Sequence, residues 1–229
     1  RSDIYFPMSY FQPIHDVFFT WGDLSKVVFS EYHHNKITKF INVGNLFYSF
    51  PKLEKLRENA LSKIKNNLDK DIILNLAVFD RSSSESSYIP PKYHSYFYDK
   101  VIELSENNKI NLLIKPKQPI KDEILNYRKI RSRIHNLIDK KKLFLFNHQD
   151  SIYEAACLSN ASLSIGLNTA GVMGAVMGTT PFFWDVQKTS NSTYQKISEM
   201  AGFNNEFFIS EDLDTLFDNI FPVFSGHLL

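Results

Sequence analysis

Cysteine, net charge and long apolar runs are what this sequence has least of. Cys157 is the single cysteine among 229 residues, so no disulfide can form within the chain. No spacing of Cys and His resembles a zinc site, and we expect no bound metal. A chain without disulfides is typical of a reducing compartment, which favours a cytoplasmic location.

The charge balance and the hydropathy pattern exclude two further classes of protein. Lys and Arg total 26 against 25 Asp and Glu, and a formal net charge of +1 provides no overall field for attracting nucleic acid. We therefore expect no nucleic-acid partner. No run approaches the ~20 apolar residues that cross a bilayer, so we expect no transmembrane segment. A peripheral position at the inner face of the plasma membrane stays open.

Short apolar runs alternate with helical segments from Asp71 onward. This alternation predicts a parallel sheet with helices on both faces. We therefore predict a doubly wound, Rossmann-like α/β domain over residues 71–229. The expected strands are 71–79, 110–114, 142–146, 161–165 and 180–184, and the expected helices are 93–107, 120–137, 151–158, a segment ending near Met177, 190–201 and 212–221.

Residues 1–70 have a different pattern. Strands are expected at 17–22 and 39–43, and a charged amphipathic helix is expected at 53–68. The sequence begins with Arg1 rather than Met, which fits a piece of a longer protein. We predict that residues 1–70 are the end of a preceding N-terminal domain plus a linker.

The turn after the fourth expected strand is the strongest candidate for a binding site. Ligands of doubly wound sheets bind outside the carboxyl ends of the strands, where this turn lies. Asn168, Thr169, Ala170 and Gly171 open a helix without a bulky side chain over its first amides, and such amides bind phosphate. The alternative is that Asn168 or Thr169 only caps the helix.

Three other loops at the expected carboxyl ends carry polar residues. Lys115 follows the second strand and can place a positive charge near a phosphate or carboxylate. His148 follows the third strand, in a loop with groups of the kind that read a nucleobase edge. Arg81 and Ser82 follow the first strand and can hold a diphosphate. Each loop can equally be a solvated turn.

Residues 161–166, continued by 168–171 and 178–181, resemble the donor-site segment of GT-B glycosyltransferases. The order of elements also resembles the C-terminal, donor-binding half of these enzymes, particularly bacterial surface and capsular polysaccharide transferases. Residues 17–48 are similar to the passage from the N-terminal domain into the donor domain. The resemblance thus covers most of the chain.

The sequence departs from this family pattern at two places. Gln118 stands where many relatives have the His of a Lys/Arg-x-His-Pro element, so no role of that His carries over. Gly174 stands where many have a Glu that binds the donor ribose. Because glycine has no side chain for this contact, CMP or CDP becomes a stronger candidate for the nucleotide, beside UDP.

The resemblance implies a sugar nucleotide, preferably of the pyrimidine type, as substrate and no further cofactor. It also implies a glycan or lipid-linked acceptor, bound largely by an N-terminal domain that this chain lacks, and it identifies no catalytic base here. The alternatives are a sugar-nucleotide epimerase or a glycerophosphotransferase of similar fold. A different class is also open, a non-catalytic module that binds nucleotide or a partner.

Overall fold

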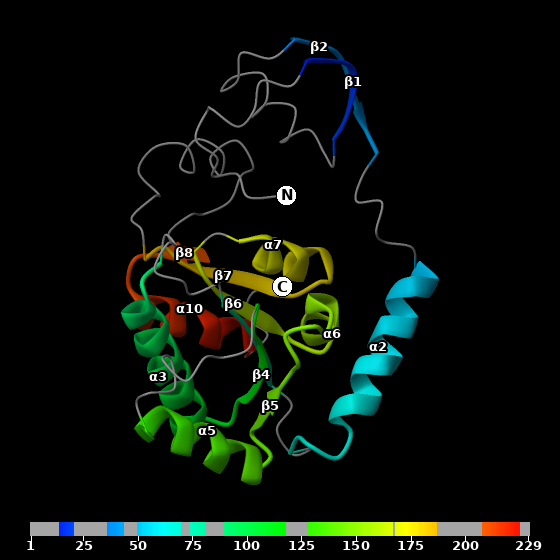
Figure 1. Cartoon of the computed structure of the whole chain (residues 1–229). Coiled ribbons are helices and arrows are strands. Elements are labelled where there is room, and N and C mark those ends of the chain that lie inside the picture. The colour runs from blue at the N-terminus through cyan, green and yellow to red at the C-terminus, as the bar shows by residue number, and fades with distance from the viewer. Residues whose placement is uncertain are drawn as a thin grey trace.

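The computed structural model describes residues 14–20, 36–43, 50–69, 74–80, 89–117, 128–166, 168–186 and 208–224. Its elements alternate along the chain as β1 (Ile14–Thr20), β2 (Lys36–Asn42), α2 (Phe50–Ile64), β3 (Asn75–Phe79), α3 (Pro91–Asn107), β4 (Asn111–Lys115), α5 (Arg128–Asp139), β5 (Leu143–Leu145), α6 (Ile152–Ala156), β6 (Ala161–Ile165), α7 (Thr169–Val176), β7 (Thr180–Trp184), β8 (Ile209–Ser210) and α10 (Leu213–Phe224). Figure 1 shows their arrangement.

Six strands form one parallel sheet in the order β5-β4-β3-β6-β7-β8. The first three strands of this unit run outward to one edge, and the next three run outward to the other. This is the doubly wound order, in which the direction of winding reverses between the first and fourth strands, here β3 and β6. The predicted Rossmann-like α/β fold is confirmed.

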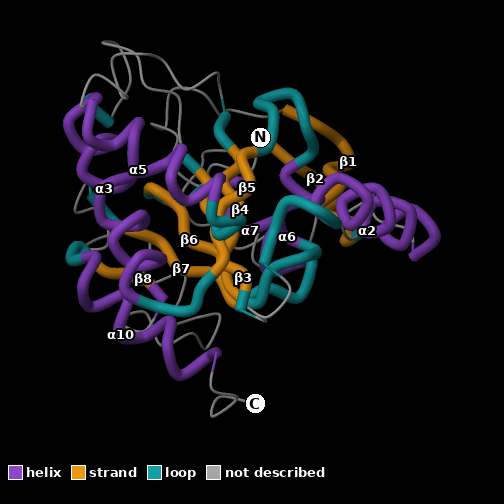
Figure 2. The backbone as a smooth tube through the Cα atoms, turned by 90° about the horizontal axis from the view of Figure 1, so that it is seen from below, coloured by secondary structure: helices purple, strands orange, loops and turns teal. Residues whose placement is uncertain are grey.

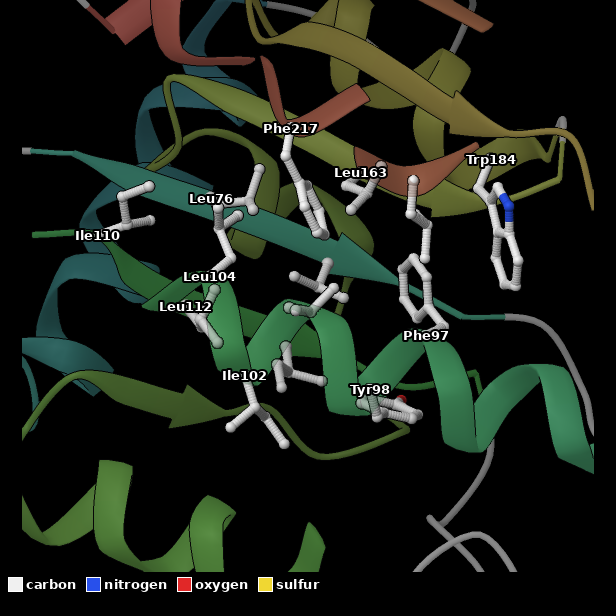
Figure 3. Packing of buried hydrophobic residues seen from close by; sticks show 14 of the residues in the cluster. Leu76, Phe97, Tyr98, Ile102, Leu104, Ile110, Leu112, Leu163, Trp184 and Phe217 are labelled. Atoms are coloured by element: carbon white, nitrogen blue, oxygen red, sulfur yellow. The ribbon is translucent and has the colours of Figure 1, made fainter. Parts of the chain in front are cut away.

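Helices cover both faces of the sheet, as Figure 2 shows. On one face, α3, α5 and α10 enclose the larger apolar cluster. Phe97 of α3 reaches toward the sheet in Figure 3, where its ring stacks beside Trp184 with the ring centroids 6.0 Å apart. On the other face, α2, α6 and α7 close a smaller cluster that includes Phe79, Leu113 and Phe146.

The expected strands and helices agree closely with the observed ones. β6 and β7 have the predicted bounds, and β3, β4 and β5 each lie within two residues of prediction where the structure describes them. The two-residue strand β8 was not predicted, because its Ile209–Ser210 pair is too short to produce a pattern. The expected helix 190–201 lies outside the described residues.

Four elements differ from their predicted bounds by three residues or more where the structure describes them. α2 ends at Ile64 rather than near residue 68, because a turn in which the Asn67 amide donates to the Ile64 carbonyl closes it. α10 continues to Phe224, through Pro222, which lacks the N–H that a residue in the last turn of a helix normally donates to the carbonyl four residues earlier. β1 and β2 both begin three residues earlier than expected and pair in parallel, apart from the main sheet in Figure 1.

Candidate functional site

The reversal of strand order brings two loops together at the carboxyl edge of the sheet. β3 pairs directly with β6, with Phe79 opposite Ser164. Asp80 follows β3 on the way to α3, and Gly166 follows β6 on the way to α7. Because α3 and α7 cover opposite faces, the chain separates here, and such a switch point is where ligands of this fold bind.

Two hydrogen bonds fix the described residues at the two ends of the turn between β6 and α7. Gly166 has a φ of 62° and its amide donates to the Trp184 carbonyl at 2.7 Å. A side chain other than glycine's is strained at such a φ. Asn168 is the N-cap residue of α7, and its side-chain oxygen accepts a hydrogen bond from the Gly171 amide at 2.9 Å. Capping, one of the two interpretations of this turn, is therefore present.

The Asn168 side chain caps the Gly171 amide and leaves the first amides of α7 without this acceptor. The amides of Thr169 and Ala170 are the first two of α7 and have no acceptor within the helix. They are the groups that would meet a phosphate, while Asn168 holds Gly171. The hydroxyl of Thr169, also predicted to bind, lies outside the side chains that the structure describes.

α7 lies unusually close to the sheet because two of its residues are glycines. A Cβ atom at Gly171 would stand 2.4 Å from the Phe183 ring and 2.7 Å from the Ser164 hydroxyl. One at Gly174 would stand 2.8 Å from the Thr179 hydroxyl. Position 174 thus faces the sheet, so the structure leaves no room for the ribose-binding Glu of the family pattern.

Lys115 is placed at the carboxyl edge, as predicted, but its ammonium is engaged. Nζ donates to the Pro116 carbonyl at 2.7 Å and to the His148 carbonyl at 3.0 Å, and the residue is only 4% exposed. Burial lowers the pKa of Lys115, although the carboxylates of Asp80 and Asp150 oppose this. Lys115 therefore ties the loop after β4 to the loop after β5.

The loop after β5 is further fixed from α2. Asp150 accepts from the Asn147 amide at 2.7 Å and from Lys63 Nζ at 2.8 Å. Lys63 also reaches Glu154 at 2.5 Å. Burial alone would raise the pKa of Asp150, but these hydrogen bonds outweigh it and lower the pKa. The loop around His148 is thus preorganised, with the imidazole half-buried.

Asp80 was not among the predicted site residues, yet it is the central charged group of this edge. Its Oδ1 accepts from the Lys117 amide at 2.6 Å, and its Oδ2 accepts from the Tyr98 hydroxyl at 2.9 Å. Burial raises the pKa of Asp80 to about 6, against the opposing effects of the Lys117 amide, Tyr98 and Lys115. The available signal was its position as the first residue after a buried strand.

His94 is a second buried polar group of α3. It is fully buried, and neither ring nitrogen has a hydrogen-bond partner among the described residues. Burial lowers the pKa of His94 to about 4. On a helix, residue 94 lies between the directions of Phe97 and Tyr98, one turn nearer the N-terminus and hence nearer the carboxyl edge of the sheet.

The structure therefore brings the described members of the predicted site to one edge. The Lys115 ammonium donates a hydrogen bond to the main-chain carbonyl of His148. Asn168–Gly171 follow β6, the strand next to β3. Arg81 and Ser82 lie outside the described residues. Within the described part of the chain, no group of His, Cys, Asp or Glu residues is arranged to hold a metal ion. No described helix is long and apolar enough to cross a membrane.

Comparison with known proteins gives no relative. No protein-family model matches the chain, and no curated protein matches it either. The arguments about function therefore depend on the fold and on the loops at the carboxyl edge.

Proposed function

We propose that this chain is the donor-binding portion of a glycosyltransferase that acts in bacterial cell-surface polysaccharide biosynthesis. The observation that carries the proposal is the switch point between β3 and β6, where the first amides of α7 open onto the carboxyl edge of a doubly wound sheet. Such a position suits the phosphates of a nucleotide. The resemblance of residues 161–181 to GT-B donor sites supplies the reaction class.

The reaction requires stabilisation of charge on the leaving nucleotide. Transfer of the sugar leaves a phosphate oxygen with growing negative charge, and preorganised donors at that position lower the barrier. The amides of Thr169 and Ala170 provide such donors, and the turn, fixed by hydrogen bonds at its two ends, holds them in place. We assign the acceptor, and the catalytic base, to an N-terminal domain that precedes this unit.

Calorimetric titration tests nucleotide binding directly. We expect CMP, CDP or UDP to bind with a Kd in the roughly micromolar to millimolar range, because one domain alone buries only part of the ligand. GDP and sulfate serve as controls. Heats for all three pyrimidine nucleotides that match those of sulfate would remove the proposal.

A charge placed at the start of α7 tests the site itself. Asn168→Asp keeps the cap oxygen for the Gly171 amide and favours the helix dipole by ~0.3–1 kcal/mol, which offsets the loss of the long Nδ2 hydrogen bond to the Ile165 carbonyl at 3.4 Å, so stability should change little. Nucleotide binding should weaken about tenfold or more, since a carboxylate then opposes the phosphate. Ala175→Glu is the matched control, because it adds the same charge at an exposed position in the second half of α7. Equal effects of the two changes would place the phosphate elsewhere.

One observation favours a second candidate, a nucleotide-binding module without transferase activity. Gly174 lies against the Thr179 and Ser162 hydroxyls, so the chain lacks the ribose contact of the family pattern and has no space to provide it. Assays of the full-length natural protein for nucleotide binding and for sugar transfer would separate the two. Sugar transfer supports the first candidate, and nucleotide binding without turnover supports the second.

A further inference from the structure

Two lysines lie close together in sequence at the end of β4, Lys115 as its last residue and Lys117 two residues further on, and their environments differ. Lys115 is buried and gives two of its three N–H groups to the Pro116 and His148 carbonyls. Lys117 is exposed, and its ammonium forms no ion pair or hydrogen bond with the part of the chain that the structure describes. Of the two, Lys117 has the charge that is available to a ligand.

The backbone of Lys117 is fixed by Asp80. Its amide donates to Asp80 Oδ1 at 2.6 Å, across from β4 to the end of β3. The other carboxylate oxygen accepts from Tyr98 of α3 at 2.9 Å, so the carboxylate itself is held from the helix side. Asp80 thus links α3, the switch point and the loop that carries Lys117.

The charges around Asp80 suit this arrangement. Tyr98 faces it from α3, Lys115 from β4 and Lys117 from the following loop, while the neighbouring described positions of β6, Ser164 and Gly166, carry no charge. Lys115 is also close to the Asp150 carboxylate, which is paired with Lys63, so the attraction of an anion to this part of the edge depends on the exposed Lys117. The pKa of Asp80, raised to about 6 by burial, keeps the group mostly ionised at neutral pH.

We propose that Asp80 is a positioning residue of the nucleotide site, which holds the loop after β4 so that the Lys117 ammonium meets the phosphate groups of the ligand. This inference rests on the proposed function. A loop that is fixed before binding loses less conformational freedom when the ligand arrives, and affinity gains accordingly. Asp80 acts through Lys117 and does not itself contact the anion.

A double-variant comparison tests the proposal with CDP and UDP as probes. Asp80→Ala alone would leave the buried Tyr98 hydroxyl without its acceptor, so Asp80→Ala is combined with Tyr98→Phe and compared with Tyr98→Phe alone. We expect the added Asp80→Ala change to weaken binding about tenfold. Asp80→Asn keeps an oxygen for the Lys117 amide, and its affinity should stay within about threefold of the parent.

Coupling to Lys117 distinguishes positioning from general structural support. Lys117→Ala should weaken binding by about the same factor as the loss of Asp80. Adding Asp80→Ala and Tyr98→Phe to Lys117→Ala should then have little further effect, because both act through one contact. The inference would be overturned if the losses of nucleotide affinity from the two sites multiplied. It would also be overturned if the Asp80→Ala/Tyr98→Phe chain bound nucleotide as tightly as Tyr98→Phe alone.

A second readout needs no ligand. In a nitrogen-15 NMR titration of the parent chain, the Lys117 amide proton should shift with a midpoint near pH 6, and Asp80→Asn should abolish this titration. A Lys117 amide that does not titrate would contradict the hydrogen bond on which the inference depends. If the parent binds no nucleotide, the proposed function fails and the inference fails with it. If the parent binds and the Asp80 variants are indifferent, only the inference fails.

Discussion

The two faces of the six-stranded sheet are built from different side chains, and β6 shows the contrast within one strand. Toward α3 and α10 it presents Ala161, Leu163 and Ile165, all in the larger apolar cluster. Toward α7 it presents Ser162 and Ser164, whose buried hydroxyls have no hydrogen-bond partner among the described residues. Within β6, one face carries apolar groups that fill the larger cluster, and the other carries small side chains that let α7 approach.

Stability and the geometry of the site therefore depend mainly on opposite faces of the same sheet. Apolar burial contributes about 25 cal/mol per Å², so the face with large aliphatic and aromatic side chains supplies most of the favourable free energy of folding. The close approach of α7 instead fixes where its first amides stand. Changes on the first face should therefore alter stability, and changes on the second should alter the position of the site.

The largest effect is expected on the apolar face, from Phe97→Ala. The Phe97 ring is fully buried and stacks on Trp184 at an interplanar angle of 5°. Its removal should lower the free energy of unfolding by ~3–5 kcal/mol, measured by urea denaturation. Tyr96→Ala is the matched control, because Tyr96 also contacts Trp184 but is 44% exposed. Similar losses from both changes would contradict the assignment of stability to buried contacts.

Two buried ionisable groups, His94 and Asp80, should change the free energy of unfolding with pH in opposite directions, by about 3 kcal/mol each. The pKa of His94 is lowered to about 4, so stability falls as the pH drops from about 6.5 toward 4. The pKa of Asp80 is raised to about 6, so protonation on going from about 6 toward 3.8 adds stability. In the parent chain these two changes nearly cancel.

Single variants should expose each contribution. His94→Leu should leave a chain that becomes more stable on acidification through this window, because the raised pKa of Asp80 then acts without the opposing change at His94. Asp80→Asn should leave a chain that loses stability on acidification and is more stable than the parent at pH 7. Urea denaturation between pH 4 and 7 measures both. Parallel pH profiles for the two variants would refute the opposing contributions.

Close packing on the α7 face is tested by Gly171→Ala, for which we expect a loss of ~1–3 kcal/mol. The new methyl would meet the Phe183 ring at 2.4 Å, and that ring is itself buried. Gly174→Ala should cost less, because its closest neighbours are the Thr179 and Ser162 hydroxyls. Ser162→Ala should recover part of the Gly174→Ala loss. If Ser162→Ala recovers none of the loss, α7 does not pack against β6 as closely as described.

The smallest effect is expected from the ion pairs that Lys63 of α2 forms with Asp150, in the loop after β5, and with Glu154 of α6. Lys63→Met removes the contacts to Asp150 and Glu154, and because Lys63 is partly exposed the loss should stay below ~1 kcal/mol. The difference from the parent should also shrink in 1 M salt, where exposed charges are screened within roughly 3 Å. A larger, salt-independent loss would mean that Lys63 stabilises the chain through apolar packing of its side chain rather than through these ion pairs.

The sequence was sufficient to locate the strands β3, β4, β5 and β6, because each is a short, largely apolar run. DIILNLAVF, NLLIK, KLFLF and ASLSI have no competing helical period, so β3, β4, β5 and β6 were found close to their true bounds. The candidate loops followed from the same pattern, since the carboxyl ends of parallel strands share one edge. Lys115, His148 and Asn168 were placed at that edge from the sequence alone.

Side-chain partners at the edge could not be predicted in the same way. Lys115 was expected to face a ligand, but the structure shows its ammonium bound to two carbonyls. Asp80 and Tyr98 are 18 residues apart and Lys117 is 37 residues from Asp80, so no local pattern connects them. The direction of a polar side chain depends on which acceptors the fold brings near, and these come from distant segments.

The sequence by itself determined which segments are strands, which are helices and which ends of the strands carry polar residues, because burial and periodicity are local properties of the chain. Only the tertiary structure decided that β3 and β6 are neighbours, that Gly171 and Gly174 face the sheet, and that Asp80 holds the loop of Lys117. Each of these depends on contacts between residues far apart in sequence, whose free energies are set by distance, burial and the groups that share the space.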